Sequence, residues 1–188
     1  VTLQDGDRVF LGANKGGVAR THLLELTQED LAYAQGFSLV YSNCNGFADR
    51  ELPKMKAAGL PIAFDFSDRW TPDYLEATLP WVDIALLSCS HLPAGQREEV
   101  LAQALHLGAR IAVATAGQEG SWVLWEGKLF HAPAARAAQV VDTMGAGDAY
   151  FAAFLCSLLK TAGEEGLFAR DLSHRIPQAM GQAAAYAA

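Results

Sequence analysis

The sequence predicts an α/β protein whose sheet is doubly wound and mainly parallel, with helices on its flanks. From Phe37 onward, short apolar or β-branched runs alternate with helical patterns of about ten residues or more, which is the signature of repeated βα units. Further along, a short apolar run, a glycine-rich turn and an apolar helical pattern follow one another at 140–155. The chain has 188 residues, of which 51% are hydrophobic; this is enough to bury one core, so we expect a single domain at 1–188 rather than two.

The individual elements follow from local composition. Apolar and β-branched runs predict four strands, at Phe37–Asn43, Pro61–Phe66, Asp83–Ser88 and Arg110–Thr115. Helical patterns lie between them, at Asp49–Ala58, Pro72–Leu79 and Gly95–Leu107. We expect right-handed crossovers between successive strands.

Two segments predict antiparallel hairpins rather than βα units. Residues 1–13 alternate around the turn signal Asp5-Gly6, and this hairpin is expected to project from the main sheet. In the second, Glu126-Gly127-Lys128 turns between strands at Trp122–Trp125 and Leu129–His131.

Composition excludes several classes of function. Lysine and arginine number 14 against 21 acidic residues, so the overall field is negative and would repel nucleic acid or an anionic membrane surface. No apolar run reaches the roughly 18 residues that span a bilayer, and the start does not resemble a signal peptide. Three cysteines without a C-x-x-C pair argue against a disulfide framework or a structural zinc site. We therefore expect a cytoplasmic protein with no nucleic-acid or membrane partner.

The strongest functional signal is a glycine-rich turn between an apolar run and a helix, Val140-Val141-Asp142-Thr143-Met144-Gly145-Ala146-Gly147-Asp148. Gly145 and Gly147 let the backbone approach a ligand closely, and the first N–H groups of the helix make an anion site. Asp148 would repel a bound phosphate there unless it has a chemical role. A general base that accepts the proton of a phosphoryl-acceptor hydroxyl is such a role. The backbone amides at 145–147 would then neutralise charge on the transferred group.

A structural interpretation of the same run is a tight turn in which Asp148 complements the helix dipole. The preceding Asp142-Thr143 and the apolar helix behind the turn weigh against it. Two other phosphate loops do not fit, since a dinucleotide fingerprint needs a third glycine where Tyr150 stands and no G-x-x-x-x-G-K-[ST] occurs. A dehydrogenase and a P-loop enzyme are therefore disfavoured.

The segment 142–148 resembles the D-T-x-G-A-G-D signature of the ribokinase-like (PfkB) carbohydrate kinases. The resemblance implies that Asp148 is the catalytic base and that the backbone amides of Gly145, Ala146 and Gly147 form the anion hole. It also implies ATP as the phosphoryl donor, with Asp142 and Thr143 near the nucleotide phosphates or their Mg²⁺.

Two further segments agree with this family in order and spacing. The segment 115–121 resembles the T-x-G-x-x-G-s loop, which implies that Thr115, Gly117 and Gly120 receive the nucleotide; without that context it could be an ordinary strand-to-hairpin turn. The segment 64–70 resembles D-x-N-x-R, which implies that Arg69 is directed toward the phosphates as a charge clamp. Ser67 replaces the usual asparagine there, and a surface loop with a solvated arginine is the alternative interpretation.

One segment departs from the family pattern. Many members carry N-x-x-E to organise Mg²⁺ through water, whereas this chain has Ser88-Cys89-Ser90-His91 and no carboxylate at that place. The outer shell of the metal must then be built differently, and Asp142 is the candidate for it. We assign no direct metal ligand, because none of the five histidines pairs with another at metal-ligand spacing.

The resemblance covers nearly the whole chain, but family members begin with additional sequence that includes the sugar site. Residues 1–13 would correspond to the end of a lid hairpin, through which two copies could form a homodimer. The chain starts at Val1 and closes with an Ala-rich helical pattern at 176–188 that lacks a glycine cap, so we expect it to be part of a longer protein.

Within the family, residues 63–70, residues 141–147 and the missing N-x-x-E look most like fructoselysine 6-kinases and similar fructosamine kinases. The same resemblance suggests contacts with the sugar or its aminoacyl part at Asn14, Lys15, Asn43 and Asn45. Short polar loops carry such residues by default, which is the plainer explanation of them.

The expected function is therefore the Mg²⁺-dependent transfer of the γ-phosphoryl group of ATP to a hydroxyl of a small sugar-derived substrate, with fructoselysine as the named candidate. Two alternatives stay open. One is a catalytically silent nucleotide-binding regulator of the same fold, and the other is a nucleoside or vitamin kinase.

Overall fold

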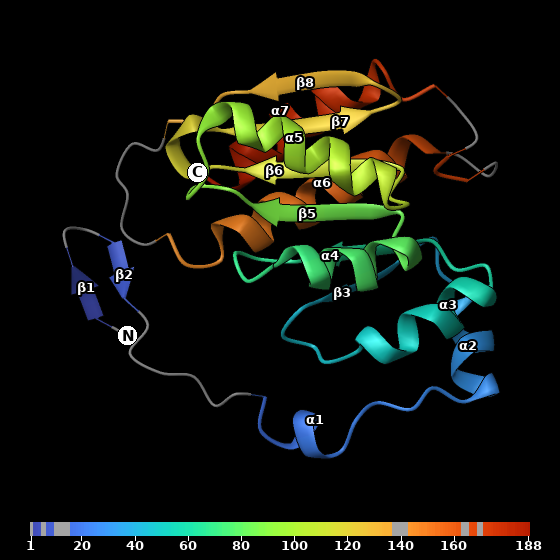
Figure 1. Cartoon of the computed structure of the whole chain (residues 1–188). Coiled ribbons are helices and arrows are strands. Elements are labelled where there is room, and N and C mark those ends of the chain that lie inside the picture. Colours follow the sequence, from blue (N-terminus) through green and yellow to red (C-terminus); the bar gives the residue numbers. More distant parts are fainter. Residues whose placement is uncertain (1, 5–6, 10–15, 137–142, 163–165, 169–170) are drawn as a thin grey trace.

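The computed structural model describes residues 2–4, 7–9, 16–136, 143–162, 166–168 and 171–188 (Figure 1). Its main sheet has six strands in the order in which they occur along the chain: β3 (Val40–Asn43), β4 (Ile62–Asp65), β5 (Ile84–Ser88), β6 (Ile111–Thr115), β7 (Ser121–Trp125) and β8 (Lys128–Ala132). The strands β3 to β6 are parallel, and β7 and β8 continue the sheet as an antiparallel hairpin. All four predicted parallel strands are confirmed, each beginning one to three residues later than the sequence suggested.

Helices connect the strands and cover both faces of the sheet. They are α1 (Val18–Thr21), α2 (Gln28–Ala34), α3 (Leu52–Ala57), α4 (Pro72–Thr78), α5 (Ala94–His106), α6 (Ala146–Ala162) and α7 (Arg175–Tyr186), with short 3₁₀ turns η1 (Asp49–Glu51), η2 (Leu79–Trp81) and η3 (Gly117–Glu119). The three predicted crossover helices are present as η1 with α3, as α4 with η2, and as α5. The predicted helix near the end of the chain is α7.

The central strands read as continuous apolar runs because both of their faces are buried. Successive residues of β5 alternate between two cores: Ile84 and Leu86 pack with α6 and α7, whereas Ala85 and Leu87 pack with α3, α4 and α5. The first core includes Phe151 and Phe154 of α6. This alternation is the period of two that a strand imposes, so each strand supplies both layers.

The class of fold is as predicted, an α/β sheet with helices on both faces. Within the described residues the strand order runs in one direction only, so the crossover helices gather on one face. The opposite face is covered by α6 and α7, which pack against each other and follow the β7–β8 hairpin in the chain. The second layer therefore comes from the chain's last two helices.

Both predicted hairpins are present. The strands β1 (Thr2–Gln4) and β2 (Asp7–Val9) pair antiparallel, with Thr2 opposite Val9, in a small sheet that stands apart from the main one (Figure 1). The turn of the β7–β8 hairpin is one residue shorter than predicted, because Lys128 already pairs with Trp125. Its two central residues, Glu126 and Gly127, have φ of 47° and 74°, as the type I′ turns that suit two-residue hairpins require.

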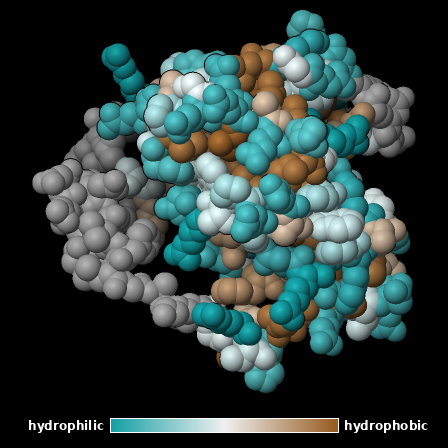
Figure 2. Space-filling model, viewed as in Figure 1, coloured by the Kyte–Doolittle hydropathy of each residue, from teal (hydrophilic) through white to brown (hydrophobic). Residues whose placement is uncertain are grey.

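The surface is mixed in character. Figure 2 shows hydrophilic residues over much of one face, with hydrophobic patches between them. Among the described residues, no helix is both long and apolar enough to cross a membrane.

Candidate active site

The glycine-rich turn leads directly into α6. Gly145 has a φ of 80°, a conformation that L side chains rarely adopt, and its carbonyl accepts a hydrogen bond from the Ala149 N–H at 2.8 Å. The Ala146 N–H donates to the Thr143 carbonyl at 3.2 Å, which closes the turn. A Cβ atom at either Gly145 or Gly147 would meet no atom within 4 Å, so space for a ligand lies in front of this backbone.

Asp148 stands in the first turn of α6 and is exposed. Its charge acts on two neighbours, Tyr41 on β3 and Asp65 at the carboxyl end of β4. Burial raises the pKa of Asp65 to about 6, and the charges of Asp148 and Asp68 add to this effect, while the hydrogen bond from the Ser67 N–H at 2.7 Å opposes it. Burial also raises the pKa of Tyr41, again with contributions from Asp65 and Asp148. Asp148 is therefore exposed to solvent and close enough to the buried carboxyl group of Asp65 to affect its pKa.

Three of the predicted site residues lie together on this side. The Asn45 N–H donates to Asn43 Oδ1 at 2.9 Å, and Arg69 Nη1 donates to Asn45 Oδ1 at 3.3 Å. Arg69 is exposed and does not line the cavity described next, so the structure brings it to the asparagines instead. Asn14 and Lys15 lie outside the described residues.

A cavity of about 380 Å³ lies between the ends of β5 and β6, the 117–121 loop, the start of α6 and the end of α7. Four of the predicted nucleotide-binding residues line it: Thr115, Gly117, Gly120 and Thr143. Two of the predicted anion-hole residues, Ala146 and Gly147, line it as well. Of the predicted nucleotide-binding residues that the structure describes, only Arg69 does not. Asp142, the remaining predicted member, lies outside the described residues.

The 117–121 loop depends on glycine at one position above all. Gly120 has a φ of 98°, and a Cβ atom there would stand 2.1 Å from the Ala132 carbonyl oxygen. No other residue fits without moving β8. This close approach explains why the loop carries a glycine immediately before β7.

A hydrogen bond that the sequence patterns did not predict links this loop to α6. The Tyr150 hydroxyl donates to Ser121 Oγ at 2.7 Å, both side chains are buried, and both residues line the cavity. Burial raises the pKa of Tyr150 to about 12. The feature of the sequence that could have indicated this contact is the position of Tyr150, two residues after Asp148 on the same helix.

The segment that replaces N-x-x-E also borders the cavity. Ser88 and Ser90 line it, whereas the ring of His91 lies against Trp70 with the ring centroids 5.5 Å apart. In the part of the chain that the structure describes, no group of three or more His, Cys, Asp or Glu residues could hold a metal ion.

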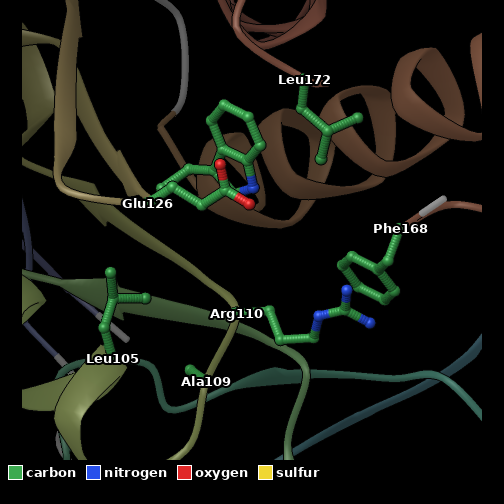
Figure 3. A pocket seen from close by; sticks show the side chains of 7 residues that line it. Leu105, Ala109, Arg110, Glu126, Phe168 and Leu172 are labelled. Carbon is green, nitrogen blue, oxygen red and sulfur yellow. The ribbon is translucent and has the colours of Figure 1, made fainter. Parts of the chain in front are cut away.

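A second cavity of about 270 Å³ lies near the start of β6 and the β7–β8 turn (Figure 3). It is therefore at the end of the sheet opposite to the carboxyl ends of the parallel strands. Arg110 places its guanidinium 3.8 Å from the centroid of the Phe168 ring there, and Glu126 and Leu172 face the same space. None of the predicted site residues lines this cavity. The cavity at the ends of β5 and β6 is therefore the candidate nucleotide site.

The chain is similar to known proteins over nearly its whole length. The family profile of the pfkB family carbohydrate kinases matches residues 2–187. The chain is 35% identical to a fructoselysine 6-kinase of Shigella flexneri over its whole length, and 33% identical to a fructosamine kinase of Bacillus subtilis over 82% of it. It spans 66% and 54% of the lengths of these two relatives.

Solved structures show the same fold. A microbiome-derived acarbose kinase superposes with a TM-score of 0.65 at 25% identity, over 84% of this chain and 52% of that one. A ribokinase of Arabidopsis thaliana, solved with ribose and ATP, superposes with a TM-score of 0.63 at 21% identity, over 85% and 52% of the two chains.

Proposed function

The chain belongs to the pfkB family of carbohydrate kinases, and from this premise we propose that it transfers the γ-phosphoryl group of ATP to a hydroxyl of a sugar derivative. The observation that carries the proposal is the position of Asp148. It is exposed on the first turn of α6, directly after Gly147, which lines the cavity, and its charge reaches Asp65 and Tyr41 on the other side. A group so placed can act between a nucleotide in the cavity and an acceptor beside β3 and β4.

In the proposed reaction, the acceptor hydroxyl oxygen forms a bond to the γ-phosphorus while the bond from that phosphorus to the bridging oxygen of ADP breaks. The hydroxyl proton passes to the Asp148 carboxylate, which is the general base. The amides of the turn at 145–147, together with the helix dipole of α6, stabilise the charge on the transferred group.

The cavity suits a nucleotide because glycine, alanine and serine make up most of its lining, so backbone groups can come close to a ligand. Gly117, Gly120 and Gly147 leave N–H and C=O groups accessible, and the apolar ends of α7 and of the 133–135 segment supply flat surface for a base. Mg²⁺ would arrive with the nucleotide and be held chiefly by its phosphates, as this ion usually keeps several waters and few protein ligands. Asp142 is the proposed outer-shell carboxylate.

The acceptor is the finer part of the proposal. Two relatives of this chain are named for fructoselysine and fructosamine, and we propose a substrate of that class, a sugar joined to an amino acid. Asn43 and Asn45 would bind its hydroxyl or aminoacyl groups, and Asn14 and Lys15 are further proposed contacts. A cytoplasmic location, where ATP is available and the three free cysteines stay reduced, goes with this activity.

The test is ADP release by the full-length protein in a coupled assay, with fructoselysine, free sugars, nucleosides and vitamins as acceptors. We expect turnover with the sugar-amino acid adduct, and its loss when a chelator removes Mg²⁺. Turnover that excess chelator does not diminish would refute the metal requirement. ATP binding without turnover on any acceptor would identify a silent regulator, and a preference for nucleosides or vitamins would move the chain to another kinase class.

A further inference from the structure

Among the described residues, Arg97 is a buried arginine whose role neither the motif nor the proposed reaction explains. Arg97 lies near the start of α5 and is only 2% exposed. Charged side chains are almost never this buried unless they are paired, because removing a charge from water is costly. An apolar residue of similar volume would avoid that cost, so the contacts of Arg97 should indicate why a charge is present.

Arg97 holds Glu119 with a two-pronged hydrogen bond. Nη1 and Nη2 donate to the two carboxylate oxygens of Glu119 at 2.8 Å and 2.6 Å, which is the planar geometry that guanidinium and carboxylate groups share. Glu119 closes η3 and stands between Gln118 and Gly120, both of which line the nucleotide cavity. The Arg97 charge therefore contacts the loop through the side chain of Glu119 and does not face the cavity.

The same guanidinium contacts a second loop and the sheet. Arg97 Nε donates to the Cys89 carbonyl at 3.4 Å, and the neighbours of Cys89, Ser88 and Ser90, also line the cavity. The Arg97 guanidinium carbon lies 4.8 Å from the centroid of the Trp122 ring on β7.

His131 on β8 adds to this arrangement from the other side. Its ring stacks on Trp122 with the centroids 4.6 Å apart, and its Nε2 lies 3.2 Å from the Glu119 carbonyl oxygen. Glu119 is thus held through its carboxylate by α5 and through its backbone by β8.

We infer that Arg97 is a positioning residue that fixes the two loops bordering the nucleotide cavity, 88–91 and 116–121, in the conformation that binds ATP. Arg97 does not line the cavity and acts through Glu119 and Cys89. The inference rests on the proposed function, since it assigns the cavity to the nucleotide.

The test compares Arg97→Met, Arg97→Lys and Glu119→Gln in the full-length protein. Arg97→Met keeps the length of the side chain and removes the charge and both hydrogen bonds to Glu119. We expect the Kd for ATP, by calorimetry, and the KM for ATP to rise about tenfold or more, because hydrogen bonds to charged groups are lost. We expect kcat to stay within about threefold and the KM for the sugar to stay unchanged, because Asp148 and the 145–147 turn are untouched.

Two further readouts separate positioning from a general loss of stability. Arg97→Lys should restore part of the affinity, because a lysine keeps the charge but cannot form the two-pronged contact. Hydrogen exchange of the backbone amides at 89–92 and 117–121 should accelerate in Arg97→Met, while the amides of β4 and β5 keep their protection. Glu119→Gln alters a side chain that is 58% exposed, so it should fold, and its affinity for ATP should fall severalfold.

Lys56→Met is the matched control. Lys56 Nζ forms an ion pair with Asp83 at 2.7 Å, which joins α3 to the segment before β5 at the opposite end of the sheet. Its removal should lower the thermal unfolding midpoint without changing the Kd for ATP.

The outcomes separate the inference from the function beneath it. Wild-type protein that binds no ATP would overturn the proposed function and the inference together. Wild type that binds ATP while Arg97→Met and Glu119→Gln bind it equally well would overturn the inference alone. A loss of affinity of the same size in Lys56→Met would also overturn it, because the effect would then follow stability rather than loop position.

Discussion

At the level of single residues, Asp148 is the proposed general base, and Asp148→Asn is the direct test of this role. The substitution keeps the shape of the side chain and removes both its charge and its capacity to accept a proton. We expect kcat to fall by about 10²–10⁴ while ATP binding persists, because the carboxylate acts on the acceptor hydroxyl rather than on the nucleotide. Nucleotide affinity should rise slightly, since a negative charge near the phosphates is removed. Steady-state kinetics and calorimetry measure the two effects separately.

The structural interpretation of Asp148 makes a different prediction. If the carboxylate only complements the dipole of α6, Asp148→Asn should cost about 0.3–1 kcal/mol of unfolding free energy and leave the rate nearly unchanged. A well-folded variant with near-normal kcat would therefore remove Asp148 from the mechanism.

Asp65 supplies a pH dependence that the wild-type protein should show and Asp65→Asn should lack. Because the pKa of Asp65 is raised to about 6 in the folded protein, the folded state binds this proton more tightly than the unfolded chain does. The stabilising contribution is complete at acidic pH, below the ordinary pKa of about 4, and is lost as the pH rises through 6. The asparagine variant should be the more stable protein above pH 7, by up to about 3 kcal/mol, because no buried charge forms.

Thermal unfolding midpoints between about pH 4 and pH 8 measure this difference. Glu76→Gln, which neutralises an exposed carboxylate on α4, is the control and should leave the pH profile of wild type in place. An Asp65→Asn profile parallel to that of wild type would show that another group sets the pH dependence.

How much of the site the sequence reveals depends on whether its members are close in the chain. The 142–148 run and the 115–121 loop each have a recognisable spacing, and several residues of both, among them Thr143, Gly147 and Thr115, line one cavity. Arg97 and Glu119 are 22 residues apart, and Tyr150 and Ser121 are 29 apart. No local period relates such pairs, because only the folded sheet brings them into contact. The sequence shows Asp65 as the first residue of the segment that resembles D-x-N-x-R, but it does not show that Asp65 is buried.

At the level of elements, the turn before α6 allows a test in which two neighbouring glycines should behave oppositely. Gly145→Ala places a side chain at a φ of 80°, which should cost about 1–2 kcal/mol of stability. Gly147 lies inside α6 at an ordinary helical position with open space before it, so Gly147→Ala should stabilise the helix by about 0.5–1 kcal/mol. Chemical denaturation measures both changes.

Activity distinguishes the two glycines in another way. Gly147→Ala should lower turnover despite the gain in stability, because its Cβ enters the space into which the transferred group must come. If Gly147→Ala were both more stable and fully active, the turn at 145–147 would not be the anion hole.

The elements themselves were predictable where their periodicity was strong. The buried strands and α5 follow from apolar runs and from a long helical pattern, and both were placed to within a few residues. The short helix α2 was not predicted, although Thr27 and Asp30 form a capping box at its start, a signal readable from sequence. Seven residues are too few for a period to stand out, and tertiary packing of Leu31 stabilises the helix.

At the level of the whole molecule, the second helical layer is what the sequence could least reveal. The alternation of strands and helices predicts helices on a parallel sheet, but not which face each helix covers. That choice follows from the one-directional strand order, which leaves the far face to α6 and α7. It also positions the candidate active site, since the start of α6 brings the charge of Asp148 to act on Asp65 at the end of β4.

The same arrangement leaves β3 at an edge of the sheet, and this leads to a prediction for the 188-residue chain expressed by itself. Among the described residues, β3 pairs only with β4, so its other edge offers unpaired N–H and C=O groups. Large apolar side chains are exposed nearby: Phe37 is 54% exposed, Tyr41 is 46% exposed, and Tyr33, whose ring contacts that of Phe37, is 74% exposed. We expect this chain to self-associate with rising concentration and not to be saturated by sugar.

Light scattering after size exclusion measures the association, and the full-length protein is the comparison. The double substitution Tyr33→Lys and Phe37→Lys should shift the chain toward the monomer, since charges at an exposed strand edge oppose pairing. The relatives matched by this chain are longer than it is, and additional sequence that covers β3 would remove the same association in the full-length protein. A 188-residue chain that stays monomeric at all concentrations and phosphorylates sugar with saturable kinetics would contradict both expectations, because the open edge would then be part of a complete and active enzyme.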